Sequence, residues 1–122
     1  MLNFDNSTRL SGFAKAEMTT REIGSKKTKV TQFQIATNTN RKVGDNWETF
    51  TEWHTLEAWG STAEYVSKYL KKGSSVDVEG KIEYNSYDKV YGEGKNAVTV
   101  KHTRAIIRVN EIRIRNKKED AS

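Results

Sequence analysis

The sequence predicts an all-β domain, a five-stranded, partly open Greek-key barrel with one short helix between the third and fourth strands. Two observations predict it. Apolar side chains recur at every second position over most of the chain, as in strands with one covered face. One segment instead has apolar residues at helical spacing, after three strand patterns and before two. The chain has 122 residues, which suits one domain with one core.

The first half of the chain contains three strand patterns. We expect strands over residues 8–18, 30–37 and 47–59, where small or apolar residues alternate with polar ones. The polar residues 24–27 separate the first two strands. Residues 38–46 have the composition of a loop between the second and the third.

A short helix is expected directly after Gly60. Ser61, followed by Glu64 three residues later, has the spacing of a capping box, in which the serine is the N-cap. The apolar positions that follow fall on one stripe: Ala63, Val66 and Leu70. Gly73 is the expected left-handed cap at the other end.

The last part of the chain contains two more strands. Residues 76–85 alternate, and Gly80 permits a bend at a barrel corner. Residues 88–96 are expected to form a hairpin tip, and the final strand begins near Ala97 with changes of apolar parity that predict one or two bulges. This order of elements is that of the oligonucleotide/oligosaccharide-binding (OB) fold. It predicts an OB domain over residues 1–115 and a short polar tail over residues 116–122.

Charge and composition narrow the functional classes. The net charge of +5 and the basic isoelectric point favour a polyanionic partner. The absence of cysteine excludes disulfides, thiolate metal sites and cysteine nucleophiles, and it suits a reducing, cytoplasmic setting. No apolar run reaches the length of about 18 residues that a membrane span needs. The two histidines, His54 and His102, and the carboxylates show no catalytic or metal-ligand spacing, so no enzyme, cofactor or metal is expected.

Aromatic residues mark one face of the third strand. Trp53 and Trp59 share a parity opposite to that of Leu56 and Ala58, so if the aliphatic residues pack the core, both indoles stand outside. Packing beneath the helix or in a subunit interface is the alternative for either tryptophan.

Rings on one face with cations nearby are what sequence-independent binding of single strands requires, since bases stack on the rings and cations follow the phosphates. Further rings come from the loop before the third strand and from the last hairpin: Trp47, Tyr84, Tyr87 and Tyr91. The expected phosphate contacts are Arg41 and Lys42 in the loop over residues 38–46, Lys89 and Lys95 in the last hairpin, and Lys15. Each cation taken alone could equally be a solvated surface charge.

Several ordered motifs resemble the bacterial single-stranded-DNA-binding protein family over roughly residues 8–115. They are Thr51-Glu52-Trp53-His54, Trp59-Gly60, Tyr69-Leu70-Lys71-Lys72-Gly73-Ser74 and Val78-Glu79-Gly80. The resemblance implies that Trp53 stacks on bases, that Trp59 replaces a stacking phenylalanine, and that Tyr87 replaces a tryptophan. It places His54 at a subunit contact of a homo-oligomer, either a dimer or a tetramer built from dimers. It also implies a nucleoid-associated role in DNA replication, recombination and repair.

The sequence departs from the family pattern in several places, among them Thr55 and Ser61, which replace commonly basic residues. Arg41 stands where the family often has a loop tryptophan, and Glu57 adds a carboxylate to the expected DNA face. The family usually continues into a linker and an acidic tip ending in Pro-Phe, whereas residues 117–122 read Lys-Lys-Glu-Asp-Ala-Ser. This departure puts the recruitment of other proteins through such a tip in doubt, unless a tip has been removed from the sequence.

Two alternatives stay open at this level. An OB-fold adaptor of the primosome type would use the same aromatic face to hold another protein, with nucleic acid secondary. The sequence also does not separate DNA from RNA, because the stacking faces of their bases are alike.

Overall fold

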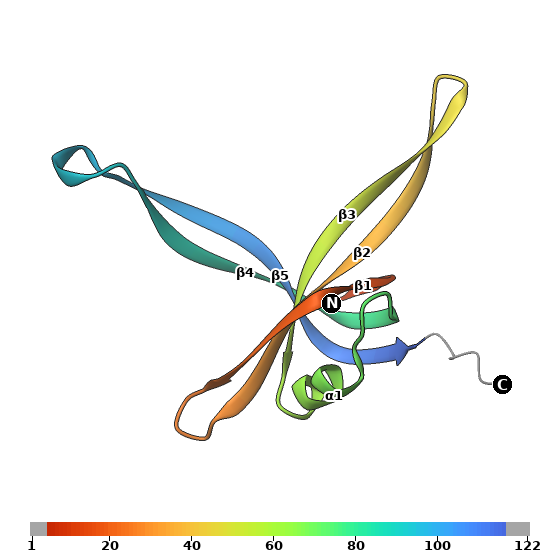
Figure 1. The fold of residues 1–122 in the computed structure, drawn as a ribbon, viewed down its shortest axis with the longest axis horizontal. Coiled ribbons are helices and arrows are strands. Elements are labelled where there is room, and N and C mark those ends of the chain that lie inside the picture. The colour runs from red at the N-terminus through yellow and green to blue at the C-terminus, as the bar shows by residue number, and fades with distance from the viewer. Residues whose placement is uncertain (1–4, 117–122) are drawn as a thin grey trace, which may run out of the picture.

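The computed structural model describes residues 5–116 and confirms the predicted architecture (Figure 1). The strands close a barrel in the order β1-β2-β3-β5-β4. In chain order the elements are β1 (Thr8–Ile23), β2 (Thr28–Val43), β3 (Asn46–Trp59), α1 (Ser61–Tyr69), β4 (Ser75–Tyr91), the short 3-10 helix η1 (Gly94–Asn96) and β5 (Val98–Arg115). No helix in this part of the chain is long and apolar enough to cross a membrane. The predicted tail lies, apart from Asn116, outside the described residues.

The β2–β3 hairpin extends far beyond the barrel as a two-stranded arm (Figure 1). The predicted loop over residues 38–46 is therefore wrong, except for its two-residue turn at Gly44 and Asp45. Residues 38–49 are all exposed, so neither face of the arm carries the apolar alternation that identifies a strand. The antiparallel backbone ladder holds it together, and cross-strand hydrogen bonds between side chains, such as Thr51 Oγ1 to Asn38 Oδ1 at 2.7 Å, add to it.

The β4–β5 hairpin forms a second arm that diverges from the first (Figure 1). Residues 88–91 belong to β4 rather than to the predicted tip, for the same reason of exposure on both faces. One of the predicted bulges exists: Glu79 pairs with Glu111 but Gly80 pairs with Val109, which leaves Asn110 as the extra residue in β5. The earlier parity change, at Val98 and Val100, reflects exposure and involves no shift in register.

Gly80 stands beside this bulge, where β4 and β5 approach each other closely. A Cβ atom at Gly80 would lie 2.2 Å from the carbonyl oxygen of Arg108, a distance that real contacts do not reach. The predicted bend at this position is thus accompanied by a packing requirement for glycine.

The hydrophobic core fills the barrel interior and the space beneath α1. Its largest members on the second and third strands are Phe33, Ile35 and Leu56, each at most 1% exposed. The helix contributes Ala63 and Val66, the apolar stripe that the sequence predicts.

The ends of the helix differ from prediction. Gly60 is the N-cap and Ser61 is already helical, so the capping box does not form. Glu64 instead lies 3.8 Å from Lys29 Nζ on β2. Gly73 has the expected positive φ of 80°, but it lies in the turn after the helix and is not its cap.

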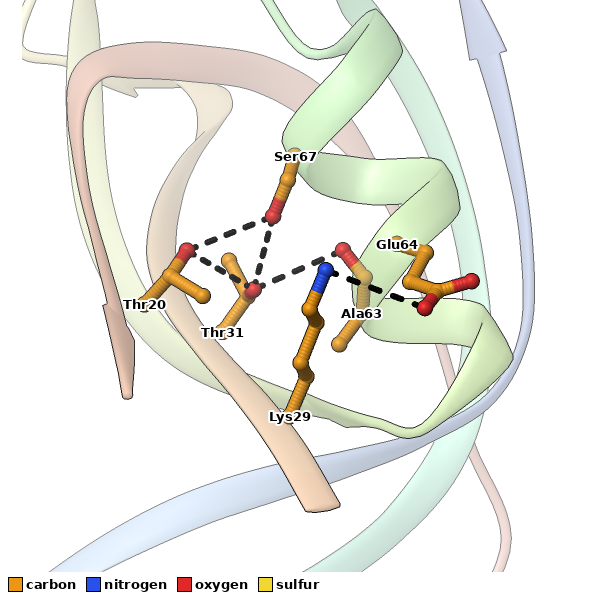
Figure 2. A network of polar contacts seen from close by, with 6 residues as sticks. All are labelled: Thr20, Lys29, Thr31, Ala63, Glu64 and Ser67. Atoms are coloured by element: carbon orange, nitrogen blue, oxygen red, sulfur yellow. Dashed lines mark hydrogen bonds and ion pairs between the residues drawn. The ribbon is translucent and has the colours of Figure 1, made fainter. Parts of the chain in front are cut away.

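A small hydroxyl network fixes α1 onto the sheet (Figure 2). Thr31 of β2 is fully buried, and its Oγ1 lies 3.0 Å from Ser67 Oγ, 3.1 Å from Thr20 Oγ1 and 3.4 Å from the carbonyl oxygen of Ala63. A buried hydroxyl without partners would destabilise the fold. Thr31 therefore connects β1, β2 and α1 through hydrogen bonds.

Candidate nucleic-acid interface

Three tryptophans stand on one face of β3. β2 and β3 pair without a register shift from Val30–Trp59 to the turn, so Trp47, Trp53 and Trp59 project to the same side. Spacings of six residues separate successive rings by about 20 Å along the strand. The side chains of Trp47 and Trp53 are 71% and 54% exposed. The structure places Trp47 within β3, in agreement with the strand predicted over residues 47–59.

Trp53 has an aromatic neighbour that the sequence analysis missed. Phe13 of β1 pairs with Ala36 of β2, which pairs with Trp53, so the two rings flank a small residue in one cross-strand row. Phe13 is as exposed as Trp53. Its sequence signal was its place among the polar positions of the first strand, between Ser11 and Lys15. Lys15 Nζ lies 5.6 Å from the centroid of the Trp53 ring, which joins the predicted cation to the predicted ring.

Trp59 is more enclosed than Trp53. Its Nε1 donates a hydrogen bond to Glu57 Oε1 at 3.0 Å, and Arg108 Cζ lies 4.3 Å from its ring centroid. Arg108 comes from β5, the strand that pairs in parallel with β3 at Glu57. Arg108 was not among the site residues predicted from the sequence, because its contact with Trp59 depends on the pairing of β5 with β3.

The β4–β5 arm continues the same surface. Lys81 of β4 pairs with Arg108, and Tyr87, Lys89 and Tyr91 share the parity of Lys81. We call the surface that bears Trp47, Trp53, Trp59, Tyr87 and Tyr91 the aromatic face.

His102 of β5 organises the outer part of this arm. Its ring stacks on Tyr87 at 5.3 Å between centroids, and its Nε2 lies 3.0 Å from the Tyr91 hydroxyl. Lys89 Nζ lies 5.4 Å from the centroid of Tyr91. Two predicted rings and one predicted cation therefore form one cluster.

The structure separates the predicted cations of the β2–β3 arm. Lys42 pairs directly with Trp47 and so belongs to the aromatic face. Arg41, one residue earlier, stands on the opposite face with its Cζ 4.6 Å from the ring centroid of Phe50. Lys95 lies in η1 at the far end of the other arm.

Two arginines that were not predicted from the sequence, Arg21 and Arg104, line a hollow beside Tyr87. An open hollow of about 570 Å³ is lined by Arg21, Arg104, Tyr87 and their neighbours Tyr84, Asn85 and Ser86. Arg104 also lines a second hollow, of about 160 Å³, with Gln34 and Thr55 of the aromatic face. Arg104 thus connects the surface near Trp53 to the surface near Tyr87.

His54 points away from the aromatic face. Its Nε2 lies 2.8 Å from Thr37 Oγ1, and its side chain lines an apolar hollow of about 300 Å³ with Leu10, Ile82 and Ile107. The predicted subunit contact of His54 stays a prediction. Among residues 5–116, no three His, Asp or Glu side chains gather in a way that could hold a metal ion.

Comparisons with known proteins place the chain in a family. Single-stranded DNA-binding protein 1 of Chlorobaculum tepidum is 37% identical over 84 residues, which are 68% of this chain and 51% of the relative. The single-stranded DNA-binding protein of Treponema pallidum is 32% identical over 72 residues, 59% of this chain and 40% of the relative. The chain thus spans about half the length of the curated relatives it matches.

A solved structure supports the fold. The Plasmodium falciparum SSB in complex with ssDNA superposes with a TM-score of 0.71 at 22% identity, covering 93% of this chain and 96% of the other. Residues 5–114 match the single-strand binding protein family. The match covers nearly the whole sequence, and so this chain belongs to the single-strand binding protein family.

Proposed function

We propose that this protein binds single-stranded DNA without reading its sequence and protects exposed strands in replication, recombination and repair. The observation that carries the proposal is the aromatic face, where exposed rings stand on the barrel and on both arms with cations beside them. Stacking accepts any base because every base has a π-face. The relatives named above are single-stranded DNA-binding proteins, which supports the same proposal.

Bases would stack on Trp53, Trp59 and Tyr87, with Trp47 and Tyr91 extending the path along the arms. Trp53 is the central contact, because it is exposed, lies on the barrel itself and has Phe13 in its row. A strand that engages both arms would cross the barrel between them, past Arg104 (Figure 1).

Phosphate contacts are proposed first for the cations on the aromatic face: Lys15, Lys42 and Lys89. Arg21 and Arg104 join them because they line the hollows beside Tyr87. Contacts from Arg41 and Lys95 require the strand to pass around the edge of one arm and the tip of the other.

The assembly and setting of the protein stay predictions. A tetramer built from dimers, with His54 at a subunit contact, would let one strand pass over several barrels. A DNA-binding role would place the protein with the nucleoid.

A titration of the protein with oligo-dT, followed by tryptophan fluorescence, tests this function. Base stacking is expected to quench the emission, and affinity is expected to fall as salt rises because phosphate contacts release counterions. A parallel titration with oligo-U compares RNA with DNA. If oligo-dT neither quenched the emission nor bound at low salt, the proposal would be wrong.

A further inference from the structure

Glu57 is a carboxylate buried within the aromatic face. Its neighbours Leu56 and Ala58 pack in the core, so Glu57 projects to the other side of β3, the side of Trp53 and Trp59. Only 7% of it is exposed. A carboxylate removed from water is unfavourable unless hydrogen bonds or cations compensate for the lost hydration. Its position near a nucleic-acid surface, where a negative charge repels phosphates, therefore requires an explanation.

The hydrogen-bond partner of Glu57 is the ring of Trp59. Glu57 Oε1 accepts the Nε1–H of Trp59 at 3.0 Å. An indole N–H is a donor only and has one direction, so this bond fixes the edge of the ring. The two residues are two apart on one strand, which places them side by side on the same face.

Arg108 holds the same ring from a second direction. Its Cζ lies 4.3 Å from the ring centroid, and its Nη1 lies 3.8 Å from Glu83 Oε1. Lys81 Nζ is also near that carboxylate, at 3.4 Å. Glu83 therefore lies beside the guanidinium that covers Trp59. The ring is fixed at its edge by one residue and covered on one face by another.

We propose that Glu57 is a positioning residue for base stacking, which holds the indole of Trp59 in the orientation that receives a base. The inference rests on the proposed function and deepens it. A ring that is ordered before binding avoids an ordering cost that corresponds to roughly 2- to 10-fold in affinity. Glu57 contributes to binding through Trp59, although its charge alone would oppose the binding of a polyanion.

The test compares Glu57→Gln with Glu57→Met. Both variants remove the charge and keep a side chain of similar length, but only glutamine keeps an oxygen that accepts the indole N–H. Affinities for oligo-dT are measured for both. The Met variant is expected to bind roughly 2- to 10-fold more weakly than the Gln variant. Equal affinities would overturn the positioning role.

The same pair in a Trp59→Phe background is the control. Phenylalanine keeps a ring but has no N–H, so the Gln and Met variants are expected to bind equally there. A difference that persists in this background would show that Glu57 acts on something other than the indole, and it would also overturn the proposal.

A ¹H–¹⁵N spectrum gives a readout apart from binding. The Nε1–H signal of Trp59 is expected to stay near its wild-type position with Glu57→Gln and to move with Glu57→Met, while the amide signals of the core stay in place. If Met disturbs the core signals, Glu57→Val takes its place as the variant without an acceptor. An unmoved indole signal in the variant without an acceptor would contradict the proposal.

The results of these experiments distinguish a failure of the positioning role from a failure of the proposed function. Failure of the wild-type protein to bind oligo-dT would overturn the proposed function and the positioning role with it. Binding by the wild type, with no difference between the Gln and Met variants, would overturn the positioning role alone.

Discussion

Lys42 of β2 lies directly opposite Trp47 of β3, while its neighbour Arg41 stands on the other face of the same arm over Phe50. Two adjacent cations in the sequence are thus separated by the thickness of a two-stranded sheet. Trp47 and Lys42 therefore stand on the face of the β2–β3 arm that lies toward the proposed DNA path, and Arg41 stands on the opposite face.

This arrangement predicts different effects for Lys42→Ala and Arg41→Ala. Loss of Lys42 is expected to weaken oligo-dT binding and to reduce the slope of log affinity against log salt by about one. Loss of Arg41 is expected to change that slope less. Affinities measured over a series of salt concentrations check this. A larger effect of Arg41 would mean that the strand follows the opposite face of the arm.

The distance between the two arms predicts a length dependence for Tyr87→Ala. Tyr87 lies in the β4–β5 hairpin. The arm that this hairpin forms diverges from the β2–β3 arm (Figure 1). An oligo-dT of about 8 nucleotides, within the range that one such barrel occupies, is expected to bind the variant nearly as well as the wild type. A longer oligonucleotide that spans both arms is expected to bind more weakly.

Val90→Ala is the matched control for Tyr87, since Val90 is exposed on the opposite face of the same strand. Its affinity for long oligonucleotides is expected to equal that of the wild type. Equal losses in both variants would mean that the arm responds to any truncation and that Tyr87 has no specific contact.

The hydroxyl network beneath α1 predicts a stability effect for Thr31→Val. The substitution keeps the shape but removes the hydroxyl that Ser67 and Thr20 contact, so the free energy of unfolding is expected to fall by about 1–2 kcal/mol. Urea denaturation measures it. Thr20→Val, at an exposed position of the same network, is expected to cost about 0.5 kcal/mol. A Thr31 variant as stable as the wild type would contradict this account of helix docking.

The close approach of β4 and β5 predicts that Gly80→Ala is strongly destabilising. The new Cβ would overlap the carbonyl oxygen of Arg108, and the expected loss is about 2–3 kcal/mol. Gly24→Ala is the comparison, because its φ of 76° is unfavourable for alanine but no atom lies within 4 Å of the new Cβ, whereas Gly80 is not a positive-φ glycine and only the overlap acts there. That variant is expected to lose about 1 kcal/mol. Similar losses at the two positions would rule out the steric explanation.

The barrel and the helix could be predicted from the sequence, because buried residues such as Phe33, Ile35 and Val66 recur at the spacing typical of a strand or a helix. The sequence was insufficient for the arms. Residues such as Asn38 and Thr51 pair across strands through the backbone ladder and a side-chain hydrogen bond, but their polar composition is the same as that of a loop.

The part of the candidate site that lies on a single strand could be predicted from the sequence. The parity of Trp53 and Trp59 follows from β3 alone, whereas Arg108, Arg104 and Phe13 reach the site from strands that pair through the topology. The contacts that enclose Trp59 could not be predicted either, since in the sequence Glu57 is only a negative charge on the expected DNA face.

The most direct test of the aromatic face is the affinity of Trp53→Ala for fluorescently labelled oligo-dT, measured by anisotropy beside Trp53→Phe and Tyr69→Ala. Tyr69 is an exposed ring on α1, outside the aromatic face. Trp53→Ala is expected to lose roughly 5- to 100-fold in affinity, Trp53→Phe to retain most of it, and Tyr69→Ala to bind as the wild type does. A Trp53→Ala variant that is folded and binds oligo-dT as tightly as the wild type would contradict the proposed role of the aromatic face.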